Sequence, residues 1–284
     1  MNRAGAVADA GAPARAPATR LAGVHATLAI ARNTFREAAR NKVLYSLLFF
    51  AILLIVSELA LGELSLNEEV RMTRDLGLFG VDLFSVLIAI FVGVNLLYKE
   101  LDLKTVYTIL PKPIARWQFV LGKWLGMLIT LALQILVMGV VLALVTIAQG
   151  AALDAAIAKA LWLLLVNVTV VTSVAILFSS FSSPFLSGFF SLGVFLVGRS
   201  VPDIRLVTAR IGGPVGRAID LASYAVPNLH LFYPSGAIIG AHQVSIHGQF
   251  VGADYLAMVT AYGAGYSLLV LGLAVWIFRR RDFV

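Results

Sequence analysis

Six long apolar runs dominate the pattern of residues along this chain. They cover residues 43–61, 76–98, 117–147, 161–178, 185–201 and 255–278. A transmembrane α-helix needs about 20 mostly apolar residues, and none of the runs alternates strictly between apolar and polar residues as a barrel strand does. The third run is longer than a bilayer requires, so one of its ends should project or tilt. The pattern predicts an all-α membrane protein with six transmembrane helices.

The composition agrees with that fold class. Of 284 residues, 60% are hydrophobic and 13% are charged, and the mean hydropathy is +0.92. A soluble chain is about 45–50% apolar and about 25% charged, so much of this apolar surface must face lipid. The absence of cysteine excludes disulfides, thiol catalysis and cysteine-ligated metal.

Basic residues gather beside the apolar runs, and the net charge of the chain is +7. Residues 1–42 hold seven Lys or Arg against two acidic residues, the 99–123 connection holds five against two, and the C-terminal tail holds three against one. Because basic residues accumulate on the cytoplasmic side of membrane proteins, both termini are expected in the cytoplasm. No basic and aromatic patch stands apart from these flanks, which argues against nucleic-acid binding.

The N-terminal region divides into a tail and a helix. Residues 1–26 are expected to form a disordered cytoplasmic tail, rich in Ala, Gly, Pro and Arg at its start. Residues 27–41 predict an amphipathic interfacial helix, followed by the six-span domain over 42–284. One stripe of that helix carries Arg32, Arg36 and Arg40, and the opposite face carries Leu28, Ala31, Phe35 and Ala38. Such a helix places its arginines toward anionic lipid or contacts a partner protein, and the pattern leaves both open.

The outer side is expected to hold a charged first loop over 62–75 and a long connection over 202–254. Residues 204–224 have helical character interrupted by Gly212, Gly213 and Pro214, which predicts a re-entrant or interfacial helix pair. This connection also carries His230, His242 and His247. They are interpreted as loop histidines because no carboxylate or third ligand lies near them in the sequence.

The cytoplasmic segment 99–117 reads KELDLKTVYTILPKPIARW. Its apolar residues Leu103, Val106, Tyr107 and Leu110 follow the spacing of a short amphipathic helix, which Pro111 and Pro113 then end. Such a helix can dock in a groove of another protein. The alternative is an interfacial helix that only reverses the chain.

Ionisable residues inside apolar spans are candidates for function. Glu58 and Asp82 lie toward the outer ends of their spans, where they either face each other or a polar substrate on a translocation path, or reach the outer interface. Arg199 ends the fifth run and is expected to turn outward. Three amides within the spans more often join helices than bind substrate: Asn95, Gln134 and Asn167.

Several segments together resemble the permeases of ABC exporters of the ABC-2 type. They are IARNTFREAARNKVLYSLLFF (30–50), YKELDLKTVYTILPKPIARWQFVLGKWLG (98–126), FSSFSSPF (178–185), YAVPNL (224–229) and FRRRDF (278–283). The resemblance covers about residues 27–284. It is nearest to the branch that includes the permease serving nitrous-oxide-reductase maturation.

The resemblance implies a six-span subunit that pairs with a second permease copy, identical or different, in a bacterial cytoplasmic membrane. Each copy would couple to a separately encoded ABC ATPase, which would bind ATP and Mg²⁺, with no cofactor in this chain. The residues implied for coupling are Glu100, Leu103, Lys104, Thr105, Tyr107, Leu110, Lys112, Pro113 and Arg116. The turn 179–184 would make a minor contact.

The chain has no phosphate-binding loop, since Gly122-Lys123-Trp124 lacks the glycine spacing and the hydroxyl of that motif. ATP hydrolysis is therefore expected from a partner.

Three other functions remain as alternatives to an exporter subunit. An intramembrane enzyme is disfavoured because none of the four histidines lies in an apolar run. An ion-coupled secondary transporter would need acidic residues at mid-membrane and inverted repeats. A non-transporting membrane scaffold is the remaining alternative.

Overall fold

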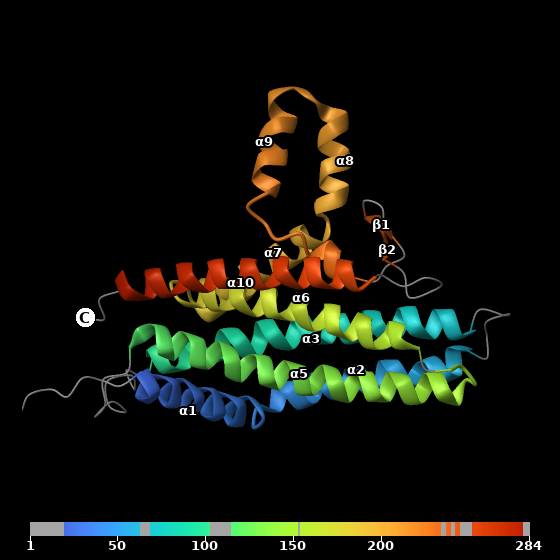
Figure 1. Cartoon of the computed structure of the whole chain (residues 1–284), viewed down its shortest axis with the longest axis horizontal. Helices are drawn as coiled ribbons and strands as arrows, with labels where there is room; N and C mark the ends of the chain where they lie inside the picture. The colour runs from blue at the N-terminus through green and yellow to red at the C-terminus, as the bar shows by residue number, and fades with distance from the viewer. Residues whose placement is uncertain are drawn as a thin grey trace, which may run out of the picture.

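The computed structural model describes residues 20–62, 69–102, 115–152, 154–233, 237–239, 242–244 and 252–280. Helices dominate this part of the chain (Figure 1). In chain order they are α1 (Arg20–Ala38), α2 (Lys42–Gly62), α3 (Glu69–Asp102), α5 (Arg116–Ala148), α6 (Ala155–Ser179), α7 (Pro184–Arg199), α8 (Val201–Ile211), α9 (Gly213–Ser223), the 3-10 helix η1 (Leu229–Phe232) and α10 (Ala253–Arg280). A short antiparallel hairpin, β1 (Ala237–Ile239) and β2 (His242–Val244), precedes α10.

Five of these helices are long and apolar enough to cross a membrane: α2, α3, α5, α6 and α10. They run lengthwise in Figure 1. A sixth span is present if α7 and α8 count as one broken span. The prediction of an all-α membrane protein is therefore confirmed.

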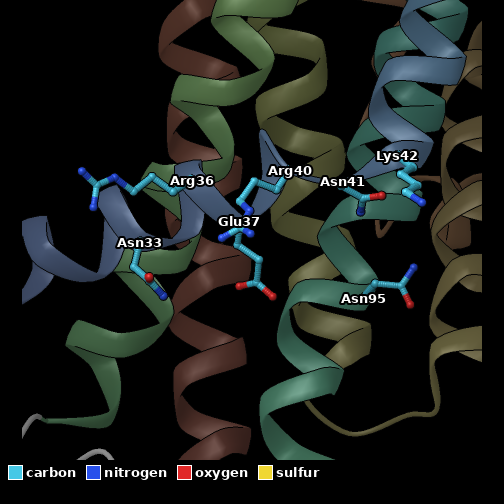
Figure 2. Close-up of a pocket in the computed structure, with 7 residues that line it drawn as sticks. All are labelled: Asn33, Arg36, Glu37, Arg40, Asn41, Lys42 and Asn95. Carbon is cyan, nitrogen blue, oxygen red and sulfur yellow. The ribbon is translucent and has the colours of Figure 1, made fainter.

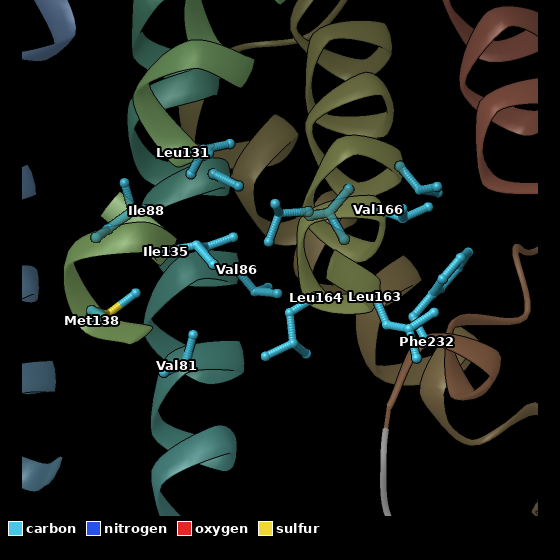
Figure 3. Close-up of a cluster of buried hydrophobic side chains, with 14 of the residues drawn as sticks. Val81, Val86, Ile88, Leu131, Ile135, Met138, Leu163, Leu164, Val166 and Phe232 are labelled. Carbon is cyan, nitrogen blue, oxygen red and sulfur yellow. The ribbon is translucent and has the colours of Figure 1, made fainter. Parts of the chain in front are cut away.

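The central helices of the bundle are α3 and α6. In their spans 72% and 67% of the residues are buried, against 22% in α2. Figure 3 shows the core that they form with α5 and η1. Its side chains include Val81, Val86, Ile88, Leu131, Ile135, Met138, Leu163, Leu164, Val166 and Phe232. Apolar residues of α2 and of much of α10 therefore face outward, where lipid would cover them.

Helix α3 begins earlier than its apolar run. The charged segment that was expected to be loop starts this helix at Glu69, so α3 is 34 residues long. Its apolar span covers only Arg74–Asn95. Hydropathy marks where the lipid-compatible part of a helix ends, whereas the backbone hydrogen bonds continue into water. The prediction of an outer loop over 62–75 is wrong for residues 69–75.

The predicted fifth span, 185–201, is broken at Ser200. Helix α7 ends at Arg199, and α8 continues from Val201 at an angle of 65°. Pro202 lies in the first turn of α8. It has no N–H to donate, and its ring would clash with the carbonyl of Gly198 in a straight helix. The chain therefore bends at this point instead of continuing as one helix.

Helices α8 and α9 form the helix pair expected in the outer connection. Gly212 and Gly213 join them with φ of +60° and +67°, a conformation that glycine adopts without a steric penalty. Arg205 of α8 forms an ion pair with Asp220 of α9, with 4.0 Å between nitrogen and oxygen. Figure 1 shows this pair standing away from the long helices.

Helix α1 packs closely against the first half of α5. A Cβ atom on Gly122 would lie 2.7 Å from Ile30 Cβ, and one on Gly126 would lie 2.5 Å from the carbonyl oxygen of Ala31. Two glycines four residues apart let helix backbones approach this closely. Thr34 of α1 is buried at this contact.

Helix α1 starts at Arg20, before the helix predicted over 27–41, so the tail expected over 1–26 is wrong for residues 20–26. On the predicted apolar face Ala31 and Ala38 are buried, whereas Leu28 is 58% exposed. The helix itself ends at Ala38, and Asn41 then caps the start of α2 by accepting the N–H of Val43 at 2.9 Å. Figure 2 shows the side chains around this α1–α2 turn and the neighbouring α3.

Candidate functional site

The segment of residues implied for coupling starts in the last turns of α3 and ends at the start of α5. Helix α3 is continuous as far as Asp102 and includes Glu100. Arg116, the last of these residues, starts α5. The others lie outside the described residues: Leu103, Lys104, Thr105, Tyr107, Leu110, Lys112 and Pro113. The structure thus describes the two ends of this segment.

The far end of the segment is attached to the last helix of the chain. The Arg116 side chain donates hydrogen bonds from Nη1 to the carbonyl oxygens of Phe278 and Arg279, at 2.9 and 3.0 Å. These carbonyls belong to the final turn of α10, where the helix dipole favours a cation. Phe119 and Phe278 stack beside this contact with ring centroids 6.1 Å apart.

The turn between α6 and α7, which the resemblance implies as a minor contact, is attached to α3. The Ser179 hydroxyl donates a hydrogen bond to the carbonyl oxygen of Val94 at 3.1 Å, and both residues are buried. Pro184 starts α7 directly after the turn. Both segments implied for partner contact therefore connect to α3.

A buried polar cluster joins α3, α6 and the end of α7. Asp82 of α3 is 1% exposed. It accepts a hydrogen bond from Asn167 Nδ2 at 2.7 Å on one carboxylate oxygen and from Arg199 on the other. The Arg199 guanidinium also lies over the ring of Tyr233, 3.7 Å from its centroid. All potential charges in this cluster have a partner.

Two sequence predictions are corrected by this cluster. Arg199 does not turn outward, because it pairs with Asp82 inside the bundle. Asp82 does not reach the outer interface. A buried charge is stable in a membrane only when it is paired and hydrogen-bonded, and the fold brings these two opposite charges together across 117 positions of the sequence. The prediction that Asn167 joins helices is confirmed.

Burial and the charge of Arg199 shift the pKa values of two groups beside this cluster, His230 and Tyr233. Burial, aided by the positive charge of Arg199, lowers the pKa of His230, although Asp203 opposes the shift. Burial likewise raises the pKa of the Tyr233 phenol. Both groups therefore favour their neutral forms at neutral pH. His230 belongs to η1, which packs against α6 and α7 and covers the cluster from the outer connection.

The comparison with protein families decides which class of protein carries this geometry. The model of the ABC-2 family transporter protein matches residues 28–283. The chain belongs to the ABC-2 transporter family. Its six apolar runs, the two connections implied for partner contact and the α8–α9 pair all lie within the match. No curated protein matches this permease.

Glu58 of the permease occupies a separate buried site. It is 2% exposed, and a Cβ atom on Gly77 would lie 3.3 Å from its Oε2. Within the described part of the chain, neither carboxylate oxygen has a hydrogen-bond partner. The interpretation that Glu58 reaches the outer interface is wrong. The two carboxylate oxygens of Asp82 accept hydrogen bonds from Asn167 and Arg199. Glu58 and Asp82 therefore do not contact each other through these hydrogen bonds.

The other polar residues of the permease spans differ in role. Asn95 donates to the carbonyl oxygen of Phe91 in its own helix, at 2.7 Å, so it does not join two helices through that bond. Gln134 is buried, and neither atom of its side-chain amide group has a partner among the described residues. Among those residues no group of three His, Cys, Asp or Glu is arranged to hold a metal ion.

Sequence reasoning missed one ion pair of the permease. Lys123 of α5 is 3% exposed and lies 3.5 Å from the Glu37 carboxylate of α1. The sequence pattern identifies Lys123 only as one of the five basic residues of the 99–123 connection. The signal that could have revealed the contact is its position between Gly122 and Gly126, since that glycine spacing marks a close helix contact.

Proposed function

We propose that this permease is the membrane-spanning subunit of an ATP-driven exporter in a bacterial cytoplasmic membrane, with both termini in the cytoplasm. It works as a pair with a second permease copy. A separately encoded ABC ATPase docks on segment 99–116 and supplies the ATP and Mg²⁺ chemistry. The observation that carries this proposal is the family match over residues 28–283. The nitrous-oxide-reductase branch stays a prediction.

The geometry of α3 supports mechanical coupling. This helix has 34 residues, which at a rise of 1.5 Å per residue gives a length of about 50 Å. The docking segment starts in the last turn of this helix, and Asp82 lies about 30 Å along the same helix from Asp102. A continuous helix can shift or rotate as a unit. Movement of the docking segment would therefore act on the Asp82–Arg199 contact.

The two ends of the docking segment are attached to different parts of the bundle. Its start continues from α3, which holds the α6–α7 turn through the Ser179 hydrogen bond. Its end is held at α10 through Arg116. A force applied by the ATPase would act between these two attachments. Such a force could shift α3 relative to α10 and switch the permease between inward and outward openings.

Substitutions in the docking segment test the proposal. Leu103→Asp places a charge on the predicted apolar stripe, and Tyr107→Pro interrupts the predicted helix. In the reconstituted complex, permease-stimulated ATPase activity should fall to the level of the ATPase alone. The matched control is Leu221→Asp, because Leu221 is 74% exposed in the outer helix pair. It should leave the stimulation unchanged.

Two further observations separate loss of coupling from loss of fold. Helix content and gel-filtration behaviour of the Leu103 and Tyr107 variants should equal those of the wild type. The wild-type permease should also retain a soluble ABC ATPase on co-purification, and both variants should release it. Stimulation that survives both substitutions in well-folded protein would refute the coupling role.

A further inference from the structure

A polar cavity lies at the junction of α1, α2 and α3. Its volume is about 870 Å³, and its lining comes from the last turns of α1, the turn before α2 and Asn95 of α3. Figure 2 shows these side chains gathered from the three helices. Neither the family match nor the proposed coupling assigns a role to this cavity.

The lining of the cavity is strongly basic. Arg36, Arg40 and Lys42 contribute three cations, and Glu37 contributes the one carboxylate. That carboxylate forms an ion pair with Lys123 of α5. Among the described residues, no ion pair engages the three cations. The cavity therefore keeps an excess of positive charge that favours an anion.

The start of α2 adds to this preference. Lys42 is the first residue of α2, and the first turn of this helix contains no acidic residue. The N-terminus of a helix carries a partial positive charge that attracts anions. Asn33 contributes a neutral amide to the same lining. The cavity thus combines three cationic side chains with a favourable helix end.

The depth of the cavity follows from the two spans that border it. The apolar span of α2 starts at Lys42, and that of α3 ends at Asn95. Both residues line the cavity, so it lies where the hydrocarbon region gives way to headgroups on the side predicted to be cytoplasmic. The cavity is therefore at the level of lipid phosphates.

Lipid-compatible side chains continue from the cavity toward the hydrocarbon. Phe49 lies two helical turns beyond Lys42 on the same face of α2 and is 61% exposed. Phe91 lies one turn beyond Asn95 on the same face of α3 and is 51% exposed. A molecule with an anionic head in the cavity would have apolar surface beside its tails.

We propose that this cavity binds the phosphate headgroup of an anionic phospholipid of the cytoplasmic leaflet. Arg36, Arg40 and Lys42 contact the phosphate, and the acyl chains run along Phe49 and Phe91. Free phosphate offers the same anionic chemistry, but it would leave the neighbouring apolar surface unused. Basic pockets between transmembrane helices on this side of a membrane are suited to acidic headgroups. The proposal does not depend on ATPase coupling, but its choice of leaflet rests on the orientation given in the proposed function.

Lipid binding to the purified full-length permease tests the site. The protein in a non-ionic detergent is titrated with phosphatidylglycerol or with phosphatidylcholine, and native mass spectrometry gives the dissociation constants. The site variant combines Arg36→Gln, Arg40→Gln and Lys42→Gln. The control variant combines Arg32→Gln, Arg210→Gln and Arg217→Gln, which removes the same charge from residues that do not line the cavity.

The expected result is a preference for phosphatidylglycerol that depends on the cavity. Each lost cation should weaken binding roughly fivefold, so the site variant should lose about a hundredfold. The control should stay within about twofold of the wild type, and inorganic phosphate at 10 mM should not displace the lipid. Lys42→Gln alone should lose roughly fivefold, which keeps the test valid if the triple site variant fails to fold.

Three results would overturn the proposal. One is phosphatidylglycerol binding that the site variant retains, which would place the lipid elsewhere. Another is an equal loss in the control variant, which would mean that overall charge alone sets the affinity. The third is displacement by inorganic phosphate together with phosphate binding as tight as that of the lipid, which would make this a site for the free anion.

Discussion

Removal of Arg199 tests the buried cluster most directly. Asp82 is 1% exposed, and its two hydrogen-bond donors are Asn167 and Arg199. The variant Arg199→Met keeps much of the side-chain volume but leaves the carboxylate with one neutral donor. Breaking a buried ion pair from one side costs about 3–5 kcal/mol, because the remaining charge stays buried without compensation.

The structure predicts that removing Asp82 costs less stability than removing Arg199. Asp82→Asn leaves Arg199 with a side chain that is 26% exposed and stacked on Tyr233. Partial access to water and a cation–π contact of about 0.5–2 kcal/mol both support the remaining cation. The loss should therefore be smaller than for Arg199→Met, about 1–3 kcal/mol, as for a charged hydrogen bond.

The assay is unfolding by sodium dodecyl sulfate in mixed micelles, with helix content giving the free energy of unfolding. The double variant Asp82→Asn, Arg199→Met removes both charges and should be more stable than Arg199→Met alone. The double-mutant cycle should give a coupling of at least about 2 kcal/mol. If the losses of the two single variants simply add in the double variant, the coupling is zero and the pair does not stabilise the fold, and the reasoning would fail.

Two further predictions concern helix packing and pH. Gly126→Ala should destabilise the permease by about 1–3 kcal/mol, because the new Cβ would lie 2.5 Å from the carbonyl oxygen of Ala31. Gly272→Ala is the control, since a Cβ atom there would have no neighbour within 4 Å. It should lose no stability in the same unfolding assay. Since the pKa of His230 is lowered from its ordinary value of 6.5 in the folded protein, its neutral form is favoured there, and stability should fall as pH drops below about 6.5. His230→Gln should remove that part of the pH dependence, and identical pH profiles for variant and wild type would contradict the assignment.

The lengths of the spans could be predicted from the sequence, because a bilayer imposes a fixed apolar thickness. The run 117–147 corresponds to α5, Arg116–Ala148, within one residue at each end. The start of α3 could not be predicted in this way, because the charged residues after Glu69 are compatible with a helix in water as well as with a loop. The break at Ser200 had a visible signal in Pro202, but the apolar residues before it obscured that signal.

The partners of the polar residues depended on tertiary structure. The sequence identifies Asp82 as an ionisable residue inside an apolar run and Arg199 as the end of another run, but hydropathy does not show which face of one helix meets which face of another. Their contact requires that α3, α6 and the end of α7 converge. The same limit applies to Arg36 and Arg40. Their helical stripe was evident from spacing, whereas the cavity also needs Lys42 and Asn95.

The outer helix pair affects how the permease can be handled in solution. Its outward-facing side chains include Leu206, Val207, Ile211, Val215 and Leu221, all more than half exposed. A detergent belt that covers only the long helices would leave this second apolar surface exposed to water. Permease molecules would then aggregate through it. Reconstitution into a lipid disc should therefore allow enough area for the projecting pair as well as for the bundle.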